Sequence, residues 1–498
     1  MACKSYETNK GSIIEDFGNL NDLAGNANVT MALETTIKQT GASSLKMTSI
    51  TAGAICVVDK TNIAWNIADG DVFSMWLYID DIAKVATSGL NLYIAADNGS
   101  FTNYYRVFIS WYGLRSGWNL MRYHTDEFVN DATSPSWSNT QDCFRINFTA
   151  AAGETPVIYM DSMRQNWTTK AYVLTIYDDG FYSPYDKIYQ KYKDNDQRYS
   201  VGVVSDLVGY SGYISEDLII SMYKEGFDFV NHTSDHTNLT SVSEAVALTK
   251  IGDCQDYLNS LAIERASNYF IYPQNAYNDT VIGALQTLGY EYARAGQVAE
   301  QSLPFDQNFK LCTMLELDDS VTTTNIEDAI DEVILKGGLC IFYGHEIVDS
   351  GASGSLEVNL AVAEHIVDYV VSNSDDVKAI TFSDIDKIIN NPSALATGSA
   401  GNAVDGKDYV PSGDYLVIRP ATTEQIMLMN LYSNQKFEVY MSNDIDYQEG
   451  DAKIRETFSE GGTFLFKDII TNDNFIKIKN TGDTTSEIGY SGFRVKGA

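Results

Sequence analysis

The segment Tyr172-Val-Leu-Thr-Ile-Tyr-Asp-Asp-Gly180 is the most informative stretch of the chain for its fold class. An apolar run is followed at once by two carboxylates and a glycine. A run of this length, bounded by polar and turn residues, is typical of a strand buried in a parallel sheet. Asp178 and Asp179 would then stand just past the carboxyl end of that strand.

From residue 171 to about residue 389, strand-like runs such as this one alternate with helical patterns. Ser215 is a fitting N-cap for one of these helices, and acidic residues fill its first turn. Repeated βα units predict a parallel sheet or barrel. The further strand-like runs are 199–204, 227–230, 269–272, 339–343 and 378–382, and the helical patterns are 216–224, 243–261, 325–335 and 357–371.

Polar residues gather at the expected strand ends. Asp178 and Asp179 follow the first strand, His232 and His236 follow the strand at 227–230, and His345 follows the strand at 339–343. In a (β/α) barrel those ends converge on one face, where such enzymes build their active sites. The sequence therefore predicts one site that contains two carboxylates and three histidines.

The spacing of two of these histidines indicates a metal. His232 and His236 are four residues apart, so both imidazoles can point the same way. Two histidines and one carboxylate are a common facial ligand set for a divalent ion, with positions left open for water and substrate. We expect one divalent ion, zinc first and cobalt, nickel or manganese as the other candidates. The alternative is a chance pair of histidines.

These segments resemble the motifs of the polysaccharide deacetylases of carbohydrate esterase family 4. Thr175-Ile-Tyr-Asp-Asp-Gly180 is similar to the family's Thr-Phe-Asp-Asp-Gly, and His232-Thr-Ser-Asp-His236 matches its His-Ser/Thr-x-x-His in full. Ile341-Phe-Tyr-Gly-His345 is similar to its last motif. The resemblance spans residues 172–389 and implies a distorted (β/α) barrel. It also implies these roles: Asp178 as general base, Asp179, His232 and His236 as metal ligands, and His345 as general acid.

The family's third motif departs from its common form. The chain reads Ile271-Tyr-Pro-Gln-Asn275 where the family often has Arg-x-Pro-Tyr-Gly, so the arginine that tunes the base is missing there. Arg294 is a candidate substitute, and the alternative is a structural arginine. We expect the backbone N–H of Gln274 to complete an oxyanion hole. The residues expected to contact substrate here are Tyr272, Pro273 and Tyr277.

Residues 12–168 show a different pattern, in which short strand-like runs are separated by clusters of Gly, Asn and Ser. This pattern predicts an all-β sandwich. Three stretches, Glu15-Asp-Phe17, Gly41-Ala-Ser-Ser-Leu-Lys46 and Val157-Ile-Tyr-Met-Asp161, resemble the first, second and last strands of carbohydrate-binding jelly rolls. The resemblance implies a structural calcium ion near Asp16 and Asp161; the alternative is that both are surface acids. Trp118 and Trp137 lie in loop-like sequence, and we expect them to stack on sugar rings.

The remaining sequence divides into a short arm and a C-terminal part. Residues 1–11 are expected to form an N-terminal arm, residues 169–392 the barrel, and residues 393–401 a linker of small residues. Short strand-like runs after the linker predict a small all-β domain over residues 402–498. This last domain carries no catalytic motif and suits an accessory or oligomerising role.

Composition narrows the classes of partner. The chain has 498 residues, and 34 basic and 67 acidic residues give a net charge of −33. So acidic a surface repels nucleic acids and anionic lipid, and no segment has the length of apolar sequence that a membrane span needs. The six scattered cysteines argue against a disulfide framework or a cysteine zinc site.

We interpret the chain as a metal-dependent deacetylase that acts on an acetylated polysaccharide. Because the first residues have no apolar core, we expect no cleavable secretory signal. A phage tail or virion, or another extracellular setting, is the expected location, with other virion proteins or a second copy as partners. Two alternatives stay open: a glycan-binding or structural protein with an inactive barrel, and hydrolysis of a different amide or ester on the same scaffold.

Overall fold

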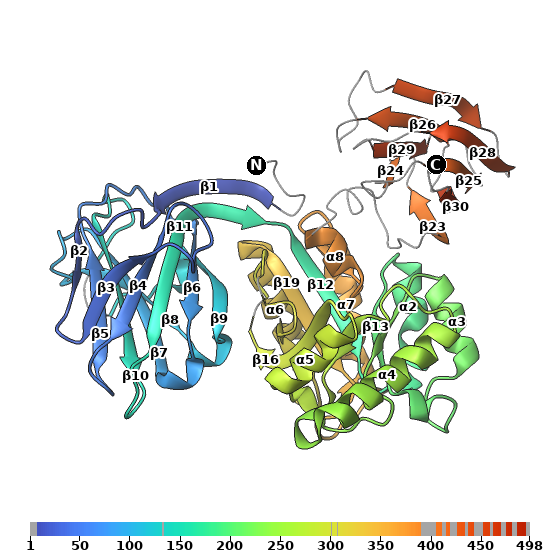
Figure 1. The fold of residues 1–498 in the computed structure, drawn as a ribbon, viewed down its shortest axis with the longest axis horizontal. Helices are drawn as coiled ribbons and strands as arrows, with labels where there is room; N and C mark the ends of the chain where they lie inside the picture. Colours follow the sequence, from blue (N-terminus) through green and yellow to red (C-terminus); the bar gives the residue numbers. More distant parts are fainter. Residues whose placement is uncertain are drawn as a thin grey trace.

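The computed structural model describes residues 7–131, 134–299, 301–305 and 307–389, together with the backbone of eight strands between residues 405 and 494. Along the chain, a β domain is followed by a (β/α) barrel and then by the C-terminal strands (Figure 1). No helix in these ranges is long and apolar enough to span a bilayer. The five cysteines among these residues are free and buried, as expected.

The N-terminal domain consists of two antiparallel sheets around one apolar core. One sheet has the order β3-β4-β11-β6-β9, with β1 paired to β11, and the other has the order β2-β5-β10-β7-β8. Phe17, Leu77 and Ile146 are fully buried between them. The strands are β1 (Glu7–Glu15), β2 (Leu23–Gly25), β3 (Val29–Glu34), β4 (Ser44–Ser49), β5 (Ile55–Lys60), β6 (Val72–Ile79), β7 (Val85–Ala95), β8 (Tyr104–Ile109), β9 (Gly117–His124), β10 (Cys143–Ala150) and β11 (Val157–Thr169).

Two details of the sequence interpretation are wrong in this domain. β1 begins at Glu7, inside the arm predicted for residues 1–11, because the edge of β11 offers its polar residues a backbone partner. Trp118 lies in β9 rather than in a loop, paired with Tyr78 on β6.

The central domain is a nearly closed parallel barrel with the strand order β17-β16-β15-β14-β13-β12-β19-β18, and β22 pairs with β12. Residues 311–317 pass from β16 to β19, where the N–H of Met314 donates to the carbonyl of Ile341 at 2.8 Å. The strands are β12 (Ala171–Tyr177), β13 (Ser200–Val203), β14 (Asp228–Asn231), β15 (Tyr269–Ile271), β16 (Tyr292–Val298), β17 (Leu311–Thr313), β18 (Leu315–Leu317), β19 (Gly338–Gly344) and β22 (Val377–Ile380). All residues of β12 and β19 are buried, as expected for a sheet covered on both faces.

Helices cover the outside of this sheet. Ser215 caps α3, its side chain accepting from the N–H of Leu218, as the sequence predicted. The helix expected at 357–371 is wrong at its start, because residues 357–359 form the strand β21, which pairs with β20. The elements are α1 (Ser183–Lys187), α2 (Tyr189–Asp194), α3 (Glu216–Lys224), α4 (Glu244–Ser260), α5 (Asp279–Thr287), α6 (Thr323–Lys336), β20 (Glu346–Val348), β21 (Glu357–Asn359), α7 (Leu360–Ser372) and α8 (Asp384–Ile389).

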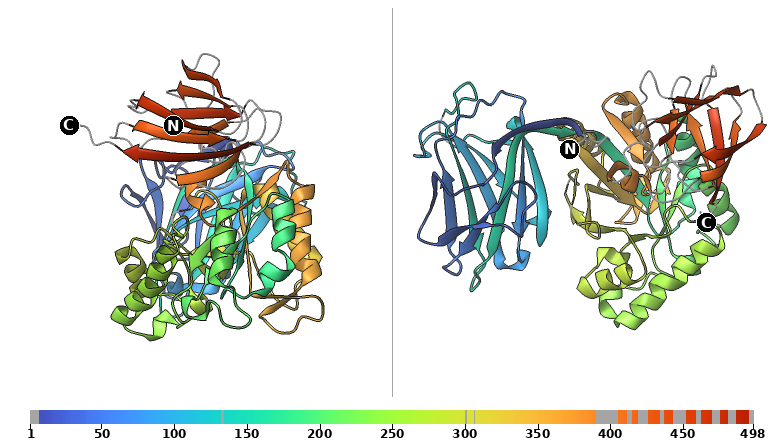
Figure 2. Two further views of the ribbon diagram at one scale, coloured as in Figure 1. Left: turned by 90° about the vertical axis from the view of Figure 1, so that its right-hand side faces the viewer. Right: turned by 45° about the horizontal axis from the view of Figure 1, so that its top comes forward.

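A short connection and several hydrogen bonds join the sandwich and the barrel. Lys170 alone separates β11 from β12, and both β1 and β11 run from the sandwich toward the barrel (Figure 2). The Arg122 guanidinium of β9 donates to Thr169 Oγ1 at 2.7 Å and to the carbonyl of Leu303 at 2.8 Å. This contact and its neighbours hold the β9 face of the sandwich against the barrel.

The C-terminal strands form two four-stranded antiparallel sheets, in the orders β23-β30-β25-β28 and β24-β29-β26-β27. These strands lie in the range expected for a small all-β domain, and that domain stays a prediction. The linker itself, residues 393–401, lies outside the described residues. The strands are β23 (Asp405–Val410), β24 (Tyr415–Ile418), β25 (Ile426–Ser433), β26 (Phe437–Ser442), β27 (Ala452–Phe458), β28 (Gly462–Ile469), β29 (Phe475–Asn480) and β30 (Ser486–Arg494).

Candidate active site

Asp178 and Asp179 leave the carboxyl end of β12 in different directions. The N–H of Asp178 donates to the carbonyl of Gly344 at 2.8 Å, which continues the β12–β19 pairing by one step. Asp179 then adopts a left-handed backbone, with φ of 67°, and Gly180 follows at 75°. This sharp turn sends two adjacent carboxylates to two different partners.

Asp178 is paired with Arg294. The Arg294 guanidinium Nη2 lies 2.7 Å from Asp178 Oδ2, and both side chains are almost fully buried. Arg294 also lies over the ring of Tyr343, with its guanidinium carbon 4.4 Å from the ring centroid. Asp178 Oδ1, although buried, has no hydrogen-bond partner among the described residues. One oxygen of the carboxylate is thus paired with Arg294, and the other is left without a hydrogen-bond donor among the described residues.

Asp179, His232 and His236 form a compact trio. Asp179 Oδ1 lies 3.3 Å from Nε2 of each histidine, and one ligand atom from each residue can be chosen so that all lie within 4.8 Å. His232 Nδ1 lies 2.8 Å from the carbonyl of Ile271, which directs Nε2 of the same ring toward Asp179. Burial acts to raise the pKa of Asp179, but the two imidazoles outweigh it and lower the pKa to about 2.

His345 follows β19 on the same side of the barrel. Its ring lies 6.2 Å from that of Tyr343, centroid to centroid, and its charge acts on Asp179. Nδ1 of His345 is buried and has no hydrogen-bond partner in the described ranges. The topology therefore brings together all five residues that the sequence placed at strand ends.

The loop after β15 forms one wall of the site. Gln274 and Asn275 both have φ of 56°, and Asn275 Nδ2 donates to the hydroxyl of Tyr343 at 3.1 Å. Gly296 of β16 makes this possible, because a Cβ there would lie 2.3 Å from the Asn275 side chain. The sequence interpretation did not identify Asn275, Gly296 or Tyr343, since each acts through contacts between strands that only barrel closure creates.

The expectation that Tyr272 contacts substrate is wrong. Tyr272 is fully buried and its hydroxyl donates to the carbonyl of Phe309 at 3.0 Å. Pro273 is buried as well and shapes the loop. Tyr277 is half-buried at the edge of this wall, with its ring 5.3 Å from that of Tyr272.

Residues 165–293 match the polysaccharide deacetylase family. Residues 165–293, which include the first half of the barrel, are therefore part of a polysaccharide deacetylase domain. The matched range contains Asp178, Asp179, His232 and His236 and ends just before Arg294. A search of curated proteins gave no match.

Several solved structures are similar to this chain. A deacetylase of Streptococcus pyogenes in complex with acetate is 20% identical, and the match covers 32% of this chain and 69% of that one, with a TM-score of 0.29. A family 4 acetyl xylan esterase of Clostridium thermocellum, in complex with a cobalt ion, is 16% identical. This match covers 44% of this chain and 91% of that one, with a TM-score of 0.32. The chitin deacetylase of Colletotrichum lindemuthianum is 17% identical. This match covers 45% of this chain and 88% of that one, with a TM-score of 0.33.

The trio in the deacetylase domain fits a divalent metal ion. It offers one carboxylate and two imidazoles, the donor set common in catalytic zinc sites, which keep an open position. The low pKa of Asp179 keeps this ligand ionised, and the hydrogen bond at His232 Nδ1 fixes the orientation of that ring. Among the described residues, no other group of three His, Cys, Asp or Glu side chains comes as close together.

The site residues expected in the sandwich fare differently. Trp118 is only 8% exposed and packs edge-on against Trp76, with ring centroids 6.1 Å apart, so the expectation of an open loop site is wrong for it. Trp137 is half-buried and stacks on Tyr105 at 3.7 Å; its role in sugar binding stays a prediction.

The calcium ion expected near Asp16 and Asp161 also stays a prediction. Asp161 is fully buried, and its Oδ2 accepts from the N–H groups of Gln39 and Thr40 at 2.6 and 3.0 Å. Asp16 is exposed, and its carboxylate accepts from the N–H of Gly18. These hydrogen bonds supply Asp161 with partners from within the protein.

Proposed function

We propose that the chain removes acetyl groups from a polysaccharide by metal-dependent hydrolysis. The observation that carries this proposal is the juxtaposition of two differently partnered carboxylates: Asp178 on a buried arginine, and Asp179 on two imidazoles. Residues of this kind, converging at the carboxyl ends of barrel strands, can supply the base, the metal ligands and the acid for hydrolysis of an amide or ester.

Asp178 is the general base in this proposal. Arg294 holds Oδ2 in place, so the open Oδ1 is the atom that accepts a proton from the attacking water. Arg294 would thus take the role of the base-tuning arginine that is missing at Ile271. Its pairing with the base supports a catalytic barrel over a vestigial one.

Asp179, His232 and His236 would hold the divalent ion, with zinc, cobalt, nickel or manganese as candidates. When bound, such an ion polarises a carbonyl and lowers the pKa of water. His345 would donate a proton to the leaving sugar nitrogen or oxygen. The backbone N–H of Gln274, in its left-handed turn beside the site, would bind the developing oxyanion.

The setting is proposed from the sequence. The β-rich flanking domains would bind glycan or assemble the protein on a phage tail or another surface-acting particle, while the barrel modifies the glycan. In such an arrangement Trp137, which is half-buried and stacks on Tyr105, would contact a sugar ring.

The test is acetate release from a panel of N-acetylated and O-acetylated glycans, such as chitooligosaccharides, peptidoglycan and acetylated xylan. Metal-loaded protein is expected to release acetate from at least one of them. The Asp179→Asn variant, which weakens the ligand set, should lose this activity together with the metal. No acetate release by metal-loaded protein across the panel would overturn the proposal.

A further inference from the structure

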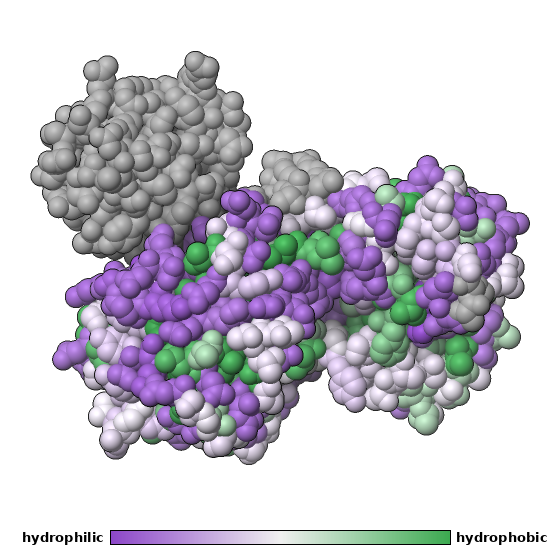
Figure 3. Space-filling model, turned by 180° about the vertical axis from the view of Figure 1, so that it is seen from behind, coloured by the Kyte–Doolittle hydropathy of each residue, from purple (hydrophilic) through white to green (hydrophobic). Residues whose placement is uncertain are grey.

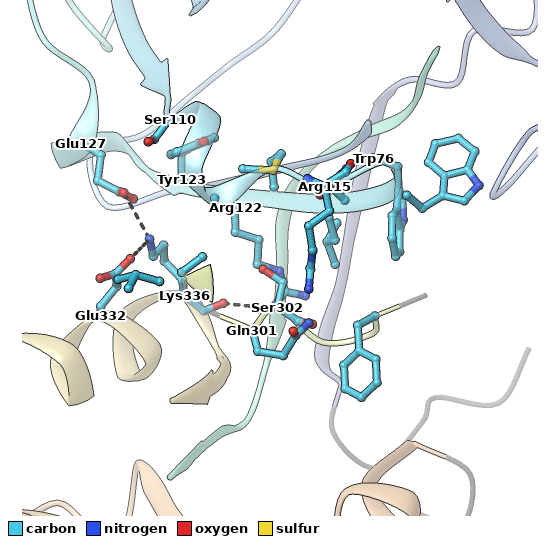
Figure 4. Close-up of a pocket in the computed structure, with 18 of the residues that line it drawn as sticks. Trp76, Ser110, Arg115, Arg122, Tyr123, Glu127, Gln301, Ser302, Glu332 and Lys336 are labelled. Carbon is cyan, nitrogen blue, oxygen red and sulfur yellow. Dashed lines mark hydrogen bonds and ion pairs between the residues drawn. The ribbon is translucent and has the colours of Figure 1, made fainter. Parts of the chain in front are cut away.

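Three arginine side chains are buried among the described residues, and they have different partners. Arg115 and Arg122 lie where the surface narrows between the sandwich and the barrel (Figure 3), and both line the cavity there (Figure 4). Arg122 donates to the carbonyls of Leu303 and Lys336, at 2.8 and 3.2 Å. Arg115 donates to the carbonyl of Lys310. These two arginines therefore join the domains through backbone carbonyl groups.

Arg294, the third buried arginine, is held in another way. Its Nη2 donates to Asp178 Oδ2 at 2.7 Å, but its Nε and Nη1 have no hydrogen-bond partner within the described ranges. The side chain is fully buried. A guanidinium carries several N–H donors, and donors that are buried without an acceptor are costly. Another interaction therefore has to hold this guanidinium where it lies.

The ring of Tyr343 supplies that interaction. The guanidinium carbon of Arg294 lies over this ring, 4.4 Å from its centroid, and Tyr343 is itself buried. The face of an aromatic ring attracts a cation, and the attraction is strongest away from water. The guanidinium thus contacts Tyr343 through the ring face and Asp178 through one N–H group. These two contacts together define its position.

Tyr343 is held in turn by Asn275. The Asn275 Nδ2 donates to the Tyr343 hydroxyl at 3.1 Å, from a left-handed backbone with φ of 56°. Gly296, two residues after Arg294 on β16, leaves the space that the Asn275 side chain fills. The loop after β15 and the strands β16 and β19 therefore each contribute to the support of Arg294.

We propose that Tyr343 is a positioning residue for the general base, because its ring holds the Arg294 guanidinium in the orientation that pairs it with Asp178. Asn275 fixes the ring and acts in the same sense. This inference rests on the proposed function for the role of Asp178. A small misplacement of a catalytic group slows the reaction. Loss of the ring should therefore lower kcat while KM and the metal trio stay as they are.

The position of Arg294 can be measured without reference to catalysis. In the full chain labelled with ¹⁵N-arginine, the Nε–H signal of Arg294 is the one that disappears in Arg294→Lys. An aromatic ring shields protons that lie over its face. Tyr343→Leu should therefore move this signal downfield, and Tyr343→Phe, which keeps the ring, should leave it near its wild-type position. A signal that does not move in Tyr343→Leu would overturn the inference.

Kinetics test the consequence for the base. Tyr343→Leu should lower kcat for acetate release about tenfold with KM and metal content unchanged, and Tyr343→Phe should keep kcat within about threefold of the wild type. Asn275→Ala should give a loss between these two.

Tyr172→Leu is the matched control. Tyr172 is a buried tyrosine of the same apolar core, but it lies at the amino end of β12, six residues before Asp178. Six residues of strand span about 20 Å. This variant should lower the free energy of unfolding, measured in urea, and leave kcat unaltered. Equal losses of kcat in Tyr172→Leu and Tyr343→Leu would overturn the inference.

A double variant tests whether Tyr343 acts through Arg294. With Arg294→Lys in place, the planar group that the ring positions is absent, so adding Tyr343→Leu should lower kcat by less than about twofold more. The full loss on both backgrounds would overturn the inference. A protein whose Arg294 signal depends on the ring in this way, but which releases no acetate from any glycan, would keep the support of Asp178 and lose the proposed function, so the two failures are distinguishable.

Discussion

The buried carboxylates at the two ends of the barrel differ in whether their oxygens have hydrogen-bond partners. At the amino ends of β13 and β14, Asp228 accepts from Arg265 Nε at 2.6 Å and from the N–H of Ser383 at 2.8 Å, and Asp384 is paired with Lys387 at 2.8 Å. At the carboxyl ends, Asp178 leaves one buried oxygen without a partner in the described part of the chain.

This difference separates groups that serve the fold from groups that serve chemistry. A buried charge with all its hydrogen bonds made holds segments together, as Asp228 does for β14 and the turn after β22. A buried charge with an open acceptor keeps that acceptor for a reactant. Substitutions at the two ends should therefore affect different measurements.

The largest effect is expected from Asp178→Asn. The amide keeps the shape of the side chain but cannot accept a proton from water, so acetate release should fall at least about a hundredfold. The bound metal should remain, because Asp178 is not in the ligand trio. Turnover close to that of the wild type, at equal metal content, would remove Asp178 as the base.

Asp228→Asn tests the other end. Breaking a buried ion pair leaves Arg265 without its counter-charge and is expected to lower the free energy of unfolding by about 3 kcal/mol. The acetate released per folded molecule should not change. Urea unfolding together with acetate assays measures both quantities, and a variant that is fully stable but inactive would contradict the division between the two ends.

Arg294→Lys should have a smaller effect on activity. Lysine keeps the charge but loses the planar group that contacts Asp178 and lies over Tyr343, so we expect kcat to fall about tenfold. Arg265→Lys, the matched change at the amino end, should leave kcat unaltered. Equal losses of kcat in the two variants would show that Arg294 acts only through stability.

The smallest effect is expected in the stability of the protein at acidic pH. Burial acts to raise the pKa of Asp384, but Lys387 and the N–H of Thr381 lower it below its ordinary value of 3.8. A lowered carboxyl pKa gives stability that is present at higher pH and is lost as the pH falls below about 4. The unfolding free energy of Asp384→Asn should therefore depend less steeply on pH in this range than that of the wild type; identical slopes would exclude Asp384 as a contributor.

The barrel and most of its site could be predicted from the sequence because the signals are local. The apolar runs of β12, β14 and β19 end directly at Asp178, His232 and His345, and parallel strands bring such ends together whatever the rest of the chain does. The contact between Arg294 and Asp178 joins residues 116 positions apart. Arg294 could be named only as a candidate, because its role depends on how β16 lies across the barrel.

Other features were beyond the reach of local patterns. Trp118 stands beside Ser and Gly residues that suggest a loop, yet pairing with β6 makes this stretch a strand. The polar sequence of β1 shows no strand signal of its own and forms a strand through the backbone of β11. The cavity lined by Trp76, Arg115 and Lys336 is formed by residues of both domains, so no pattern within one of them could indicate it.

The central claim is that Asp179, His232 and His236 hold one ion on which deacetylation depends. It is tested most directly by adding Zn²⁺ stepwise to chelator-treated protein while acetate release from a responsive glycan is recorded. We predict that activity is absent at first, rises with added ion and reaches a plateau at about one ion per chain. Acetate release that is the same without the ion and at saturation would contradict the claim.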